Sequence, residues 1–262
     1  AGKYAPCLIR CDATISDATF NFTGDEVSQS GCLCFENSDS NSLINNCDIL
    51  IDGCFARGIY SSQNELTIKE STIDIEIIPS SETSDCPGIY SSGSNFKILD
   101  STVNINSVGT SISSSSSSSM QVENSILNLS SSNAYGIYNA IGTFKDSKLN
   151  INSYSGGINM AYDKELSLID CETTIQSGLI EPNSSFTCST LSAAIYLYGN
   201  LSVTGGSLDI GSEKKGVIIY DFLDTNLTID NCATTILSAE EGIYLNDTLN
   251  STNSNNFTYL HS

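Results

Sequence analysis

Residue types that could carry out chemistry are present, but their spacing suits cross-linking better than catalysis. The ten cysteines are an even number, and Cys32-Leu33-Cys34 lacks the spacing of a zinc knuckle. The only histidine, His261, lies one residue from the end of the sequence. We therefore predict disulfides rather than metal ligation, which places the chain in an oxidising, secreted environment. We expect no cofactor and no metal site.

The positions of the cysteines suggest how they pair. Cys54 and Cys86 each lie shortly before a Gly-Ile-Tyr sequence, and Cys171 and Cys188 flank a long insertion. A third group of closely spaced cysteines lies near the beginning of the chain and is expected to form disulfides that stabilise that end. It comprises Cys7, Cys11, Cys32, Cys34 and Cys47. Cys232 has no obvious partner within the chain, which leaves pairing with another molecule open.

Acid–base chemistry has little support in the sequence. Asp221 and Asp224 form the nearest approach to a carboxylate pair, and the only arginines are Arg10 and Arg57. With 30 acidic against 10 basic residues the net charge is −20, which opposes binding to nucleic acids and to anionic membranes. No run of 18 apolar residues occurs, so no membrane-spanning segment is predicted. We expect a protein without a catalytic centre.

The chain holds eight Asn-x-Ser/Thr sequons, at which N-glycans are attached to secreted proteins. Two of them are predicted to point outward from strands, and the others to lie in turns, an insertion or the tail. They are Asn21, Asn128, Asn183, Asn200, Asn226, Asn246, Asn250 and Asn256. Covalent glycans at these positions would not disturb a core.

A repeat of 21 to 37 residues organises the sequence around variants of Gly-Ile-Tyr, as at residues 58–60 and 88–90. Its anchors are Gly31, Gly58, Gly88, Ser111, Gly136, Gly157, Ala194, Gly216 and Gly242. Each unit contains three short apolar pieces with a period of two, such as Leu66-Thr-Ile68 and Ile73-Asp-Ile75. Three strands per turn, stacked in register, predict an all-β parallel solenoid of about nine to ten coils.

A polar turn column is predicted between the second and third pieces. It contains Asn46, Glu70, Asp100, Asn124, Asp146 and Asp170, each followed by Ser or Cys. Short polar side chains tolerate unusual backbone angles and bond the turn amides, so a structural side-chain ladder is expected. A cation site built from the stacked carboxylates is the functional alternative.

These features together resemble the right-handed parallel β-helix of the pectin lyase-like superfamily, in its non-catalytic, extracellular type. The resemblance covers residues 7 to 244 and implies one continuous domain. We expect disulfide-rich coils at 1–57, regular coils at 58–245 and a polar tail or cap at 246–262. The superfamily also contains polysaccharide lyases and hydrolases, which keeps an enzyme as an alternative.

An aromatic column is predicted on the outside of the solenoid, since a residue that follows an inward isoleucine points outward. It comprises Tyr60, Tyr90, Tyr138, Tyr196 and Tyr244. Three roles are open for it: covering the strands, contacting another subunit, or stacking on sugar rings as in a carbohydrate-binding module. We favour a secreted, glycosylated structural or adhesive protein that associates with itself or with other extracellular proteins, as a filament or surface coat.

Overall fold

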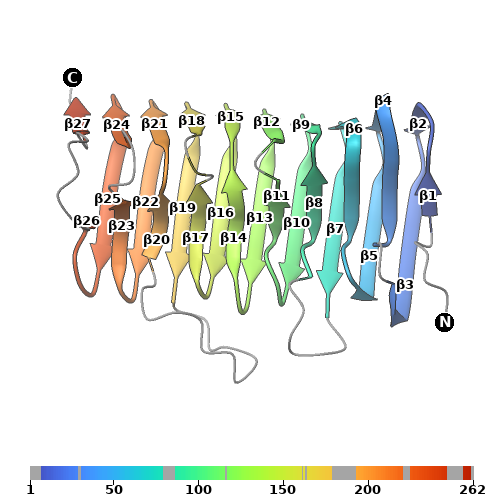
Figure 1. Ribbon diagram of the computed structural model, residues 1–262, viewed down its shortest axis with the longest axis horizontal. Helices are drawn as coiled ribbons and strands as arrows, with labels where there is room; N and C mark the ends of the chain where they lie inside the picture. Colours follow the sequence, from blue (N-terminus) through green and yellow to red (C-terminus); the bar gives the residue numbers. More distant parts are fainter. Residues whose placement is uncertain are drawn as a thin grey trace.

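The computed structural model describes residues 7–28, 31–78, 86–115, 117–160, 162, 164–178, 193–220, 225–246 and 256–260. In these ranges the chain is all β and winds into a parallel solenoid whose coils stack along the long axis, with the two termini at opposite ends (Figure 1). No helix occurs in the described ranges, and so none that could span a membrane. The predicted fold class is confirmed.

Each coil contributes a first, a second and a third strand. The third strands form a nine-stranded parallel sheet. They are β3 (Thr19–Ser28), β5 (Asp48–Phe55), β7 (Thr72–Ile77), β10 (Thr102–Ser107), β13 (Ile126–Ser131), β16 (Lys148–Ser153), β19 (Glu172–Ser177), β22 (Ser207–Ser212) and β25 (Ala233–Ser238). Nine strands are separated by eight steps, so the solenoid has about eight turns rather than nine to ten.

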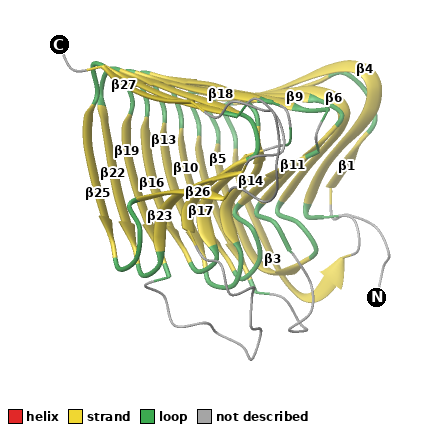
Figure 2. Cartoon of the chain, turned by 60° about the vertical axis from the view of Figure 1, so that its left-hand side comes forward, coloured by secondary structure: helices red, strands yellow, loops and turns green. Residues whose placement is uncertain are grey.

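The first and second strands together form an 18-stranded sheet (Figure 2). First strands are β1 (Cys7–Ile9), β8 (Ile89–Ser92), β11 (Ile112–Ser114), β14 (Tyr135–Ala140), β17 (Gly156–Met160), β20 (Ala193–Leu197), β23 (Lys215–Tyr220) and β26 (Ile243–Asn246). Second strands are β2 (Ala13–Ser16), β9 (Asn95–Leu99), β12 (Ser119–Glu123), β15 (Gly142–Lys145), β18 (Glu165–Ile169), β21 (Asn200–Thr204), β24 (Asn226–Asp230) and β27 (Asn256–Leu260). The longer strands β4 (Leu33–Asn45) and β6 (Ile59–Lys69) cover both positions.

Stacked isoleucines fill the interior as predicted. Ile59, Ile89, Ile137, Ile158 and Ile195 are at most 1% exposed and belong to one continuous core cluster. Ile243, in the last coil, is only half-buried. The register also corrects one anchor of the repeat, because Leu33 pairs with Ile59 and Cys32 therefore takes the position equivalent to Gly58.

The glycine of Gly-Ile-Tyr is explained by close packing against the third strand. A Cβ atom at Gly136 would clash with Ile151 Cγ2 and lie 2.8 Å from the carbonyl oxygen of Gly157. Gly88 has the same relation to Ile105. The coil of Ser111 has Leu129 in place of the isoleucine, and leucine lacks the branch at Cβ. In these coils the glycine thus leaves room for an isoleucine 15 or 17 residues later, whereas Ala194 takes the same position in the coil of Ile210.

The turn column is confirmed in its backbone geometry. All six predicted residues have φ between 49° and 52°, a left-handed conformation that Asn and Asp tolerate better than most residues. Asn46 Nδ2 donates to Asp17 Oδ1 at 2.6 Å, and Asn124 Nδ2 donates to Asp100 Oδ1 at 3.2 Å. The residue that follows is buried, and where it is serine its hydroxyl accepts a backbone amide of the neighbouring coil, as Ser101 N donates to Ser125 Oγ at 3.1 Å.

Candidate functional site

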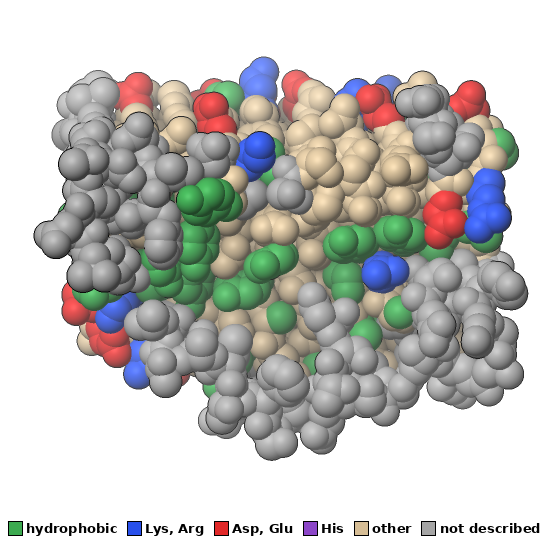
Figure 3. All heavy atoms as spheres, viewed as in Figure 1, with side chains coloured by type: hydrophobic (Ala, Val, Ile, Leu, Met, Phe, Trp, Pro, Cys, Tyr) green, Lys and Arg blue, Asp and Glu red, His purple; other side chains and the backbone are tan. Residues whose placement is uncertain are grey.

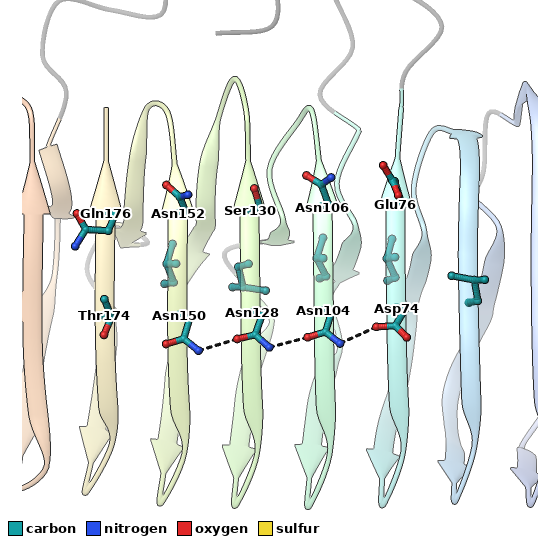
Figure 4. Close-up of a pocket in the computed structure, with 15 residues that line it drawn as sticks. Asp74, Glu76, Asn104, Asn106, Asn128, Ser130, Asn150, Asn152, Thr174 and Gln176 are labelled. Atoms are coloured by element: carbon teal, nitrogen blue, oxygen red, sulfur yellow. Dashed lines mark hydrogen bonds between the residues drawn. The ribbon is translucent and has the colours of Figure 1, made fainter. Parts of the chain in front are cut away.

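A shallow groove of about 520 Å³ runs along the outer face of the nine-stranded sheet. Its lining comes from the middle strands β7, β10, β13, β16 and β19, with Leu50 of β5 at one end. Two polar rows border it (Figure 4). The inner row is Asp74, Asn104, Asn128, Asn150 and Thr174, and the outer row is Glu76, Asn106, Ser130, Asn152 and Gln176.

From Asn150 to Asp74 the inner row is a continuous chain of side-chain hydrogen bonds. Asn150 Nδ2 donates to Asn128 Oδ1 at 2.7 Å, and Asn128 Nδ2 donates to Asn104 Oδ1 at 2.7 Å. Asn104 Nδ2 then donates to the carboxylate of Asp74 at 2.6 Å. All the donors point toward Asp74, so the amide dipoles add and a charged acceptor ends the chain. This order fixes the orientation of each half-buried amide.

The outer row is free to bind. Asn106 and Asn152 are exposed, and no hydrogen bond from their side chains to another described residue is present. A side-chain amide carries two donors and two lone pairs, and in the inner row the ladder uses one of each per internal residue. The coils of β10, β13 and β16 therefore present unused donors and acceptors at the strand spacing of about 4.8 Å.

The predicted tyrosine column exists in register, but its members differ in environment. Tyr60 and Tyr90 stack on each other with ring centroids 5.7 Å apart, and the Arg57 guanidinium lies 4.8 Å from each ring. Their faces are thereby used within the protein. Tyr138 is 38% exposed, and Lys215 Nζ lies 4.7 Å from the ring of Tyr244. An interrupted band of hydrophobic side chains runs along one face of the molecule (Figure 3).

Tyr196 is buried rather than displayed. Only 4% of it is exposed, and its hydroxyl donates to the carbonyl oxygen of Ser155 at 3.3 Å. It belongs to an aromatic cluster whose other rings sequence reasoning missed, namely Tyr135, Tyr198 and Tyr220. Tyr198 and Tyr220 each follow the tyrosine column by two residues, and this continued period of two could have revealed them. Burial raises the pKa of Tyr198, as does its hydrogen bond to Tyr220.

The cysteines lie in three environments. Cys7, Cys32 and Cys34 are neighbours at the first coils, where Cys7 N donates to Cys32 O at 3.1 Å. Burial raises the pKa of the Cys32 and Cys34 thiols to about 12, which makes them poor nucleophiles. Free thiols are present at Cys7, Cys11, Cys32, Cys34, Cys47, Cys171 and Cys232. The predicted stapling of the first coils is not formed here and stays a prediction.

Three cysteines take the place of serine in the buried turn column. Cys47 Sγ contacts the carbonyl oxygen of Asn45 at 3.3 Å, and Cys171 Sγ contacts that of Ile169 at 3.4 Å. Cys47 thus lies in the turn column, whereas Cys7 lies in a first strand, and the predicted disulfide of Cys47 stays a prediction. Cys232 occupies the same column one coil beyond Gly206. Cys86 is buried, whereas Cys188 and the side chain of Cys54 lie outside the described residues.

Four sequons can be placed with their side chains. Asn21 and Asn200 are exposed, and Asn128 is an internal member of the amide ladder. Asn226 stacks on Asn200, to whose Oδ1 it donates at 2.9 Å. The backbone of Asn256 pairs with Asn226, so three sequons stand in register on successive coils. Asn183, Asn250 and the side chains of Asn246 and Asn256 lie outside the described residues.

Asp221 and Asp224, the nearest approach to a catalytic pair, also lie outside the described residues. In the part of the chain that is described, no group of three or more His, Cys, Asp or Glu side chains is placed to hold a metal ion. The turn column acts as a structural ladder there, since its side chains bond one another and its amides bond the neighbouring coil.

No protein-family model matches the chain, and a search of curated proteins gives no significant match.

Proposed function

We propose that the chain is a secreted, N-glycosylated β-helix with a structural or adhesive role at the cell surface or in the extracellular matrix. Its repeat, its period-two strands and its turn ladder also support a place among the right-handed β-helices of the pectin lyase-like superfamily. One observation carries the proposal. The sequons Asn200 and Asn226 stand in register on the outer surface, where Asn200 is exposed and a glycan has room.

The architecture suits a load-bearing or display role. Hydrogen-bonded ladders run along the turn, the buried serine column and the inner polar row, in addition to the backbone sheets. The inner polar row links β7 to β16, and the serine column links the coils from Cys47 to Ser147, so that these ladders add stiffness to the middle of the rod. The outer face of the nine-stranded sheet is broad and regular, which favours repeated weak contacts over a single catalytic pocket.

Self-association is part of the proposal. The two edges of the nine-stranded sheet are β3 and β25, and strand edges are templates for pairing with another chain. Contact between these unlike ends is heterologous and propagates into a filament rather than closing into a dimer. Light scattering of the native protein tests this point separately. A monomer at micromolar concentration would contradict the proposed filament without bearing on the proposed secretion.

Secretion and glycosylation are tested in the cells that produce the protein. We expect the full-length protein in the medium or on the cell surface, with a mass that falls to the polypeptide mass after treatment with peptide-N-glycosidase. An Asn200→Gln variant should lose the mass of one glycan, whereas Asn106→Gln, which alters no sequon, should not. An unmodified protein that stays inside the cell would overturn the proposal.

A further inference from the structure

We propose that the groove on the outer face of the nine-stranded sheet binds an extended, neutral glycan chain laid along the solenoid axis. This inference rests on the proposed adhesive role and gives it a ligand class. The groove crosses the strands β7, β10, β13, β16 and β19, so a ligand in it meets one coil after another. Such a ligand must be long and must repeat at nearly the coil spacing of about 4.8 Å.

The chemistry of the two rows selects hydroxyl groups. Six of the fifteen lining residues carry side-chain amides, and an amide offers a donor and an acceptor side by side, as a sugar hydroxyl does. The inner row is held in one orientation by the ladder, so that its unused N–H groups and lone pairs are already placed for a ligand. Preorganised groups lose little freedom on binding, which favours affinity.

The outer row supplies the adjustable contacts. Asn106 and Asn152 are exposed on either side of Ser130, and Gln176 continues the row toward β22. Between the two polar rows the floor of the groove is strand backbone, because the side chains of Ile105 and Leu129 are only 2% exposed and belong to the core. Two parallel rows of polar side chains can hydrogen-bond the hydroxyl groups along both edges of a flat, β-linked hexose ribbon.

Charge decides against an acidic polymer. Asp74 and Glu76 stand at one end of the groove, and no lysine or arginine is among the residues that line it. A uronate or sulfated chain would meet these carboxylates and a net charge of −20. A neutral chain meets no such repulsion.

Calorimetric titration of the full chain with cello-oligosaccharides of two to six units tests the proposal. Affinity should rise with each added unit until the groove is filled, and hexagalacturonate of the same length should not bind. The double variant Asn106→Ala/Asn152→Ala should weaken binding of the hexamer at least tenfold. The matched control Gln121→Ala, an exposed amide on β12 of the other sheet, should leave binding unchanged.

Three results would overturn the inference: no binding of any neutral oligomer at millimolar concentration, equal binding by the double variant, or equal loss in the control. A double variant that alters only the oligomeric mass would show that a second copy occupies this face instead. Secretion and glycosylation of the wild-type protein are measured independently. The groove can therefore prove unable to bind glycans while the proposed extracellular role stands. Binding by a protein that is neither secreted nor glycosylated would be the opposite result, and the two measurements distinguish them.

Discussion

The inner and outer faces of the same third strands obey different rules. On the inner face, Ile151 presses against Gly136 so closely that the glycine has no room for a methyl group. On the outer face, Asn150 is hydrogen-bonded within the ladder, whereas Asn152 is exposed to solvent. Steric fit between coils determines which residues the inner face can hold. On the outer face, the polar groups that have no partner in the described part of the chain determine what the face can bind. The inner side of the strand thereby serves stability, and the outer side carries the groove for which we propose a ligand.

The steric side of this comparison gives the largest expected effect. Gly136→Ala places a methyl group against Ile151 and the carbonyl oxygen of Gly157, so overpacking should lower the free energy of unfolding by about 3 kcal/mol. Denaturant unfolding followed by circular dichroism measures it. Ser111→Ala is the matched control, since that coil already accommodates a Cβ atom and should lose about 1 kcal/mol for one hydrogen bond. Equal losses in the two variants would contradict the account of the glycine.

The turn column should show an intermediate effect. Asn124 has φ of 49°, so Asn124→Ala should cost about 1–2 kcal/mol of unfolding free energy. Asn124→Gly should cost less, because glycine adopts this conformation without steric penalty although the bond to Asp100 is lost. Thermal unfolding of the two variants compares them. A glycine variant less stable than the alanine variant would show that the side-chain bond matters more than the backbone angle.

The amide ladder on the outer face should contribute less to the free energy of unfolding than the turn column does. Asn104→Ala removes the acceptor of Asn128 and the donor to Asp74, both half-buried, and should lower the free energy of unfolding by about 1 kcal/mol. Asn106→Ala, two residues along the same strand and exposed, should change it by less than about 0.5 kcal/mol. If both variants lost the same stability, the distinction between the two rows would fail.

The smallest effect is expected at the last coils, where Lys215 forms ion pairs with Glu240 and Glu241 at 2.6 and 2.8 Å. The hydrogen bonds of Lys215 lower the pKa of both carboxyl groups. Their stabilising contribution is therefore complete above the ordinary carboxyl pKa and is lost as the pH falls through the lowered value. Melting temperatures recorded against pH for wild type and Lys215→Met should converge in acid. A constant difference at all pH values would assign the effect of Lys215 to packing.

Much of the inner face could be predicted from the sequence, because period-two isoleucines and the column of Asn and Asp report directly on burial and on backbone angle. The displaced anchor at Gly31 shows the limit, since only strand register reveals that Cys32 faces the core. The aromatic column was located correctly, but the burial of Tyr196 arises from contacts with rings in other coils. The amide groove left a signal in three third strands that each place Asn between two aliphatic residues. Its ladder depends on side-chain orientation, which spacing alone does not give.

Site-resolved glycan occupancy in the native protein tests the central claim most directly, since it asks which outer positions are available in an extracellular molecule. Asn200 is exposed at the start of β21, whereas the nitrogen of Asn128 donates within the ladder, in the inner row that lines the groove. Peptide mapping after enzymatic deglycosylation in heavy-oxygen water should show conversion to aspartate at Asn200 and an unmodified Asn128. A glycan on Asn128 would fill the groove and contradict its role in binding. The absence of glycan from every sequon would contradict the extracellular role itself.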